Sequence, residues 1–142
     1  MREDNAVNVI RQLSEQFKNG SIYDSLRFTC RYIQLNFGND KLEEIFREFW
    51  TTSTVNFFPS DNGLDFADFL LRKSEIIEDR FFADLVRYEK NMLLTLLDGK
   101  ARKMTLSFQP AEVIIPLADF QLPAGVQKGN YKITIKPDNI FG

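Results

Sequence analysis

Apolar residues recur at three- and four-residue spacings over residues 79–97, the longest such stretch in the chain. Its apolar positions are Phe81, Phe82, Leu85, Val86, Met92, Leu93, Leu96 and Leu97. This period is typical of a helix that packs over most of one side. Gly99 stands just past the last periodic residue, where glycine readily forms a left-handed C-terminal cap. We therefore predict a central helix that ends at Gly99.

Four shorter helical patterns precede this central helix. The first runs to about Asn19, with Gly20 as its stop. The second begins at Ser21, whose spacing to Asp24 is that of a capping box, and ends at Gly38. The third covers about residues 40–50, and a short fourth covers 64–72. Between them we expect an irregular turn at Pro59 and residues 61–63.

The pattern changes to a period of two after Gly99. Met104, Leu106 and Phe108 alternate with polar residues, and so do Tyr131, Ile133 and Ile135. Such alternation indicates strands with one buried face, and the β-branched run 113–115 adds a third strand that ends at Pro116. The sequence therefore predicts an α+β fold. Residues 1–99 form a five-helix N-terminal bundle, and residues 100–142 form a small C-terminal antiparallel β-sheet packed on it.

Charge is distributed unevenly between these two parts. The net charge is −2, but residues 1–99 carry 12 basic and 17 acidic residues, or −5, whereas residues 100–142 carry 6 and 3, or +3. An acidic bundle argues against bulk affinity for nucleic acid. The N-terminal residues have no apolar signal core, and no run approaches the roughly 18 apolar residues of a membrane span. We expect a cytoplasmic protein with no membrane association.

The chain has no histidine and one cysteine, Cys30, which lies inside an apolar helical pattern. Without histidine, the common nucleophile–base arrangements and most zinc or iron sites cannot be assembled. Glu44 and Glu48 face solvent, and the aspartates near Gly63 do not have calcium-loop spacing. We therefore predict no catalytic residue, no metal site and no cofactor, so the protein is not expected to be an enzyme.

Two surfaces are candidates for binding. The first is the basic sheet of the tail, with Arg102, Lys103, Tyr131, Lys132, Thr134 and Lys136 as its predicted peptide-binding residues. A free strand edge can recruit an extended peptide, and lysines favour an acidic one; lysines on an edge also prevent strand pairing. The second is a stripe of Tyr23, Arg27 and Arg31, four residues apart. It is either a partner-binding surface or an ordinary solvated helix face.

Four segments together resemble a known family. They are YDSLRFTCRY (23–32), LEEIFREFW (42–50), NGLDFADFL (62–70) and FADLVRYE (82–89). Their order is similar to that of a helical family labelled as a DNA-binding domain, whose members accompany multinuclear non-haem iron oxidative enzymes in the maturation of ribosomally made peptides, as in the methanobactin system. Ala83, Asp84, Leu85 and Glu89 match the family's Ala-Asp-Leu-x-x-x-Glu core.

The resemblance implies a non-catalytic partner protein. Such a protein forms a heterodimer with an iron-dependent oxidative enzyme, which supplies the metal chemistry, and helps to recruit the leader of a precursor peptide. The alternative is a DNA-binding transcriptional regulator, with nucleic acid as the partner. In that case Arg27 and Arg31 on the second helix would be the phosphate or base contacts, and binding would weaken steeply with salt.

Overall fold

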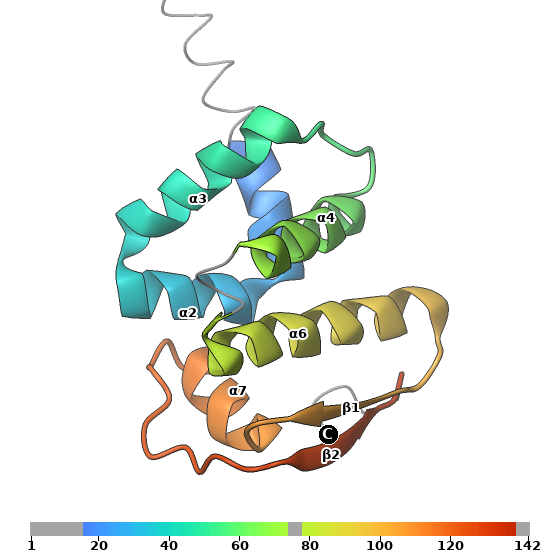
Figure 1. Ribbon diagram of the computed structural model, residues 1–142. Coiled ribbons are helices and arrows are strands. Elements are labelled where there is room, and N and C mark those ends of the chain that lie inside the picture. Colours follow the sequence, from blue (N-terminus) through green and yellow to red (C-terminus); the bar gives the residue numbers. More distant parts are fainter. Residues whose placement is uncertain (1–15, 74–77, 139–142) are drawn as a thin grey trace, which may run out of the picture.

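The computed structural model describes residues 16–73 and 78–138, and it has an α+β fold (Figure 1). A helical segment, residues 16–25, comes first. The elements that follow are α2 (Arg27–Phe37), α3 (Asn39–Thr52), α4 (Pro59–Arg72), α6 (Arg80–Asp98), β1 (Arg102–Leu106), α7 (Pro110–Ala118) and β2 (Tyr131–Ile135). The prediction of a helical bundle followed by a small antiparallel sheet is confirmed. The part of the predicted first helix before residue 16 lies outside the described residues.

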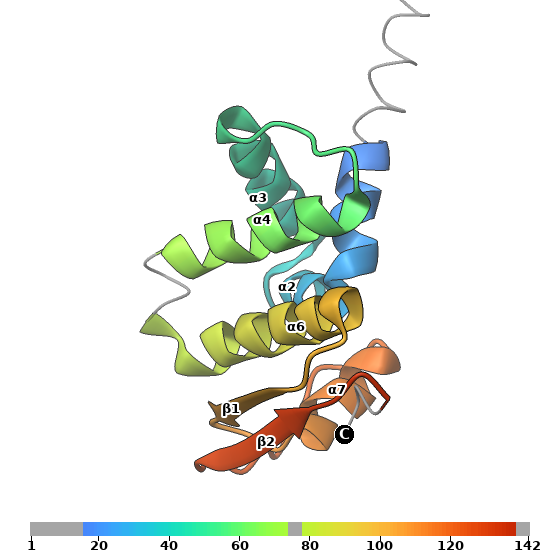
Figure 2. The same cartoon turned by 90° about the vertical axis from the view of Figure 1, so that its right-hand side faces the viewer.

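Helix α6 is the central element, as its apolar pattern predicts. Figures 1 and 2 both show it between α4 on one side and the β1–β2 sheet on the other. Its N-cap is Asp79, whose side chain accepts a hydrogen bond from the Phe82 amide at 3.2 Å, and Gly99 ends it in the left-handed conformation at φ 70°. Its own residues Leu85 and Val86 are fully buried. Contacts on both sides explain why nine of its residues are buried.

The predicted boundary at Gly20 and Ser21 is wrong. The helix runs through both residues to residue 25, and the helical conformation is interrupted at Leu26 (φ −126°, ψ 48°). The Ser21 hydroxyl donates to the Lys18 carbonyl inside the same helix, so it caps nothing. Gly20 does not adopt a positive φ. The local capping signal is therefore overridden, and α2 begins only at Arg27.

Helix α4 begins earlier than predicted. Pro59 occupies its first position, where a missing N–H costs no hydrogen bond, so residues 61–63 lie inside the helix and not in a turn. Asn62 is buried: its Oδ1 accepts from the Asn56 amide at 2.8 Å, and its Nδ2 donates to Ser21 Oγ at 3.2 Å. These bonds join α4 to the preceding loop and to the helical segment 16–25. The proline that suggested a loop is instead a helix start.

The predicted strand at 113–115 is also wrong, because these residues lie in α7. Val113, Ile114 and Leu117 are buried at helical spacing. Pro110 starts the helix, and Pro116 falls in its last turn, where the helix ends within two residues. The sheet therefore has two strands in the described part of the chain, paired antiparallel with Met104 opposite Ile133. None of the described helices is long and apolar enough to cross a bilayer.

Gly63 and Gly20 provide a matched pair of predictions. A Cβ at Gly63 would lie 2.5 Å from Ser25 Cβ and 3.4 Å from Leu93 Cδ2, so Gly63→Ala forces α4 away from its neighbours. We expect it to lower the unfolding free energy by about 2 kcal/mol. A Cβ at Gly20 meets nothing within 4 Å, so Gly20→Ala should raise stability by about 1 kcal/mol. Urea denaturation measures both, and equal effects would contradict the close contact.

Candidate functional site

The outer face of the β1–β2 sheet gathers three exposed lysines of the tail. Along both strands, Met104, Leu106, Ile133 and Ile135 pack toward α6, while Lys103, Thr105, Lys132 and Thr134 are exposed on the opposite side. Lys136 continues this exposed series. We call these five exposed residues, Lys103, Thr105, Lys132, Thr134 and Lys136, the lysine face.

The register places the three lysines around one threonine. Lys103 lies opposite Thr134, which stands between Lys132 on β2 and Lys136 just after the strand. Lys103 is therefore the diagonal neighbour of both other lysines, at a Cβ separation of about 7 Å. No described carboxylate forms an ion pair with any of the three. A hollow of about 370 Å³ lies over the sheet between Lys103 and Lys132.

Two of the six predicted peptide-binding residues do not lie on the lysine face. Arg102 is on the inner side, where its guanidinium pairs with Asp98 at 2.6 Å and contacts Thr95 Oγ1 at 3.3 Å. Tyr131 is half-buried on the same side. Arg102 thereby ties β1 to the end of α6. Alternation along the strands explains this division, since only every second residue shares a face.

The predicted stripe of Tyr23, Arg27 and Arg31 is divided by the break at Leu26. Tyr23 belongs to the segment before the break, and its hydroxyl donates to Gln34 Oε1 at 2.9 Å. Arg27 is exposed at the first position of α2. The Arg31 guanidinium instead donates to the carbonyls of Leu117 and Ala118, at 3.2 and 3.4 Å. Arg31 therefore caps the C-terminal end of α7, an interaction that the sequence did not predict.

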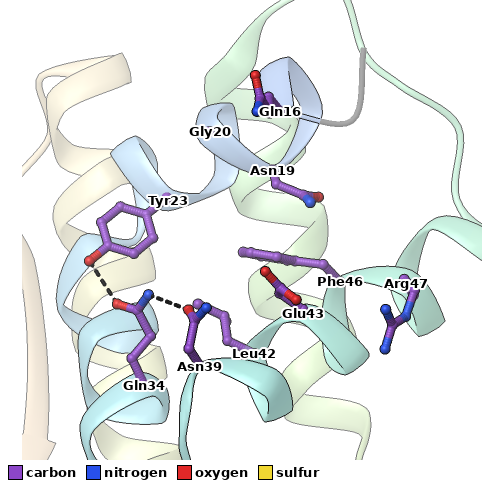
Figure 3. A pocket seen from close by; sticks show the side chains of 10 residues that line it. All are labelled: Gln16, Asn19, Gly20, Tyr23, Gln34, Asn39, Leu42, Glu43, Phe46 and Arg47. Atoms are coloured by element: carbon purple, nitrogen blue, oxygen red, sulfur yellow. Dashed lines mark hydrogen bonds between the residues drawn. The ribbon is translucent and has the colours of Figure 1, made fainter. Parts of the chain in front are cut away.

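A polar pocket of about 650 Å³ lies between the segment 16–25 and α3 (Figure 3). Amide side chains dominate its lining, and Gln34 links two of its walls: it accepts from Tyr23 and donates to Asn39 Oδ1 at 2.8 Å. Leu42 and Phe46 supply apolar surface, and Glu43 and Arg47 are its charged residues. Three separate elements contribute these side chains, so no sequence motif could reveal the pocket. The amides offer hydrogen-bond donors and acceptors to a polar ligand.

The buried carboxyl groups of α6 act on backbone amides. Glu89 is 3% exposed, and its two oxygens accept hydrogen bonds from the amides of Phe28 at 2.9 Å and Thr29 at 2.7 Å. These amides lie in the first turn of α2, where N–H groups lack an acceptor within the helix itself. Burial raises the pKa of Glu89 to about 7, although the two amides partly oppose the shift. Glu89 is therefore the N-terminal cap of a different helix.

Asp84, about one turn before Glu89 on α6, also accepts a hydrogen bond from a backbone amide of another element. Its Oδ2 accepts from the Ser107 amide at 2.9 Å, where the chain leaves β1, and its Oδ1 pairs with Arg87 at 3.1 Å. Asp84 and Glu89 are the two acidic residues of the Ala-Asp-Leu-x-x-x-Glu match. Both are nearly inaccessible to solvent. The matched residues therefore hold the fold together.

Cys30 is the remaining residue with reactive potential. It is fully buried, and burial together with Glu89 raises the pKa of its thiol well above the ordinary value. The thiol therefore stays protonated and unreactive at neutral pH. Within residues 16–73 and 78–138, no three histidine, cysteine or carboxylate side chains gather as a metal site would require.

No family model, curated protein or solved structure matches this chain. The resemblance to the partner proteins of iron oxidative enzymes therefore stays a prediction. Function must be proposed from the surfaces described above.

Glu89 makes stability depend on pH. Its pKa is about 7 in the folded chain and near 4.5 when unfolded, so between these values the folded state holds a proton that the unfolded state has lost. The stability of the wild type relative to Glu89→Gln should thus fall by about 3 kcal/mol as pH rises from 4.5 to 7. Urea denaturation of both proteins across this range measures the difference. A difference that does not change with pH would contradict the assignment.

Proposed function

We propose that this is a cytoplasmic, non-catalytic partner protein that holds an acidic, extended peptide on its lysine face. The observation that carries the proposal is the arrangement of Lys103, Lys132 and Lys136 around Thr134, without a neutralising carboxylate among the described residues. Three like charges on one small surface repel one another, and an acidic ligand relieves that repulsion. The threonines between them add hydroxyl donors for the same ligand.

The spacing suits an extended chain. Side chains two residues apart on one strand are separated by about 6.8 Å, which is close to the diagonal separation of Lys103 from the other two lysines. In the described part of the chain, β1 and β2 pair only with each other. A peptide can therefore lie across the face, or add to an edge as a strand with alternate acidic side chains turned to the lysines.

The family resemblance suggests what the peptide and the partner are. We propose the leader of a ribosomally made precursor peptide as the ligand, and an iron-dependent oxidative enzyme as the protein with which the chain forms a heterodimer. In this function the chain holds the peptide while the enzyme supplies the metal and the oxidation. Size-exclusion chromatography of this protein with an iron-dependent oxidative enzyme encoded beside its gene tests the heterodimer. Separate elution at micromolar concentration would contradict it.

The peptide-binding prediction uses a fluorescein-labelled peptide of about ten residues in which Glu and Val alternate. We expect Lys103→Gln/Lys132→Gln to weaken binding about tenfold, because each lost charge contact contributes up to about 1 kcal/mol. The double variant Lys41→Gln/Arg47→Gln on α3 removes the same net charge and should change binding little. Fluorescence anisotropy measures both affinities.

Three outcomes would count against the lysine face. Equal weakening in the two double variants would show a bulk-charge effect. Equal binding of a peptide that alternates Lys and Val would remove the requirement for acid. Tight, salt-dependent binding of a short DNA duplex that the lysine variants abolish, with no binding of the acidic peptide, would favour the DNA-binding alternative.

A further inference from the structure

Helix α7 is apolar on nearly every side. Glu112 is its only charged residue. Val113 and Leu117 are buried, and the helix contacts α2, but Ala111, Ile115 and Ala118 form an exposed stripe on another side, with Ile115 68% exposed. A helix without a polar face is normally covered on all sides. Part of α7 is therefore an uncovered apolar surface in the described chain.

This stripe forms one wall of a groove of about 510 Å³ against α2. The α2 wall consists of Arg27, Phe28 and Arg31. Both charged residues that line the groove are basic, and neither forms an ion pair with a described carboxylate. Arg31 is held by the end of α7, whereas Arg27 is exposed at the groove. The groove thus combines an apolar lining with two basic side chains, of which Arg27 also interacts electrostatically with the buried Glu89.

We propose that this groove binds an amphipathic helix from a protein partner, with acidic side chains on the flank that meets Arg27. The charge of the occupant follows from the two arginines. Its helical form follows from its backbone, because a helix satisfies its own N–H and C=O groups while an extended chain on an apolar lining would leave them unpaired. The alanines of α7 allow such a helix to approach closely.

The groove and the lysine face share no residue, so this inference stands apart from the proposed function. Helix α7 contributes one surface and the β1–β2 sheet the other, and both elements lie below α6 in Figure 1. One molecule can therefore hold a helix and an extended peptide at once. A binding experiment that contradicts the proposal for one surface therefore does not contradict the proposal for the other.

The test uses two labelled helical peptides of about 15 residues, each with leucines along one side. In one peptide the flanking residues are glutamates, and in the other they are lysines. We expect the acidic peptide to bind about tenfold more tightly than the basic one, and Ile115→Glu to weaken its binding about tenfold or more. Phe57→Glu is the matched control, because Phe57 is 89% exposed on the loop before α4 and also becomes acidic. The Phe57→Glu variant should bind the acidic peptide with the affinity of the wild type.

A charge exchange at Arg27 makes the test specific. Arg27→Glu should weaken binding of the acidic peptide and strengthen that of the basic one, a reversal that loss of folding cannot produce. Thermal melting of each variant checks that it is folded. Unchanged binding in Ile115→Glu, or no preference between the peptides, would overturn the proposal. So would a concentration-dependent wild-type dimer that Ile115→Glu disrupts, since a second copy would then be the occupant.

Discussion

The hydrogen bonds between Glu89 and the start of α2 are the interaction on which the other placements depend. The chain breaks at Leu26, and a helix that restarts inside the core has amide groups that water cannot reach. A carboxylate from α6 satisfies two of them and fixes where α2 begins and how it lies against the central helix. From that position Arg31 reaches the last carbonyls of α7. Each of the two helices therefore has one end closed by a charged side chain from a distant segment.

This arrangement links both proposed binding surfaces to α6. Asp84 holds the chain where it leaves β1, and Glu89 holds α2, which in turn holds α7. Burial of a carboxyl group is costly, and hydrogen bonds to backbone amides offset part of that cost. Because Asp84 and Glu89 lie five residues apart on one rigid helix, the sheet and the groove keep a fixed relation. The two acidic residues therefore position other elements of the fold through hydrogen bonds to their backbone amides.

Local patterns predicted the elements that local physics decides. The central helix over residues 79–97, its end at Gly99 and the outward alternation of the strand lysines all follow from the apolar period and the glycine cap. The failures occur where tertiary contacts override a local signal. Ser21 has the right chemistry for a cap but lies within a continuous helix, and the β-branched run of α7 is helical because its apolar side packs on α2.

One signal in the sequence was available for the role of Glu89. It stands three residues from both Val86 and Met92, in the apolar stripe, where an unpartnered carboxylate would be unfavourable. The arginine contact with α7 and the groove have no such signal, since they join residues more than 80 positions apart.

The connection between the two strands also bears on how the fold is reached. The 24 residues between Leu106 and Tyr131 include α7, so β1 and β2 are not a hairpin closed by a tight turn. Closing so long a loop costs more chain entropy than closing a two-residue turn, and pairing gains little until α7 has docked on α2. The sheet should therefore assemble late, after the helices have come together. The three lysines then meet only in the finished molecule, so a partly folded chain cannot present them as one surface.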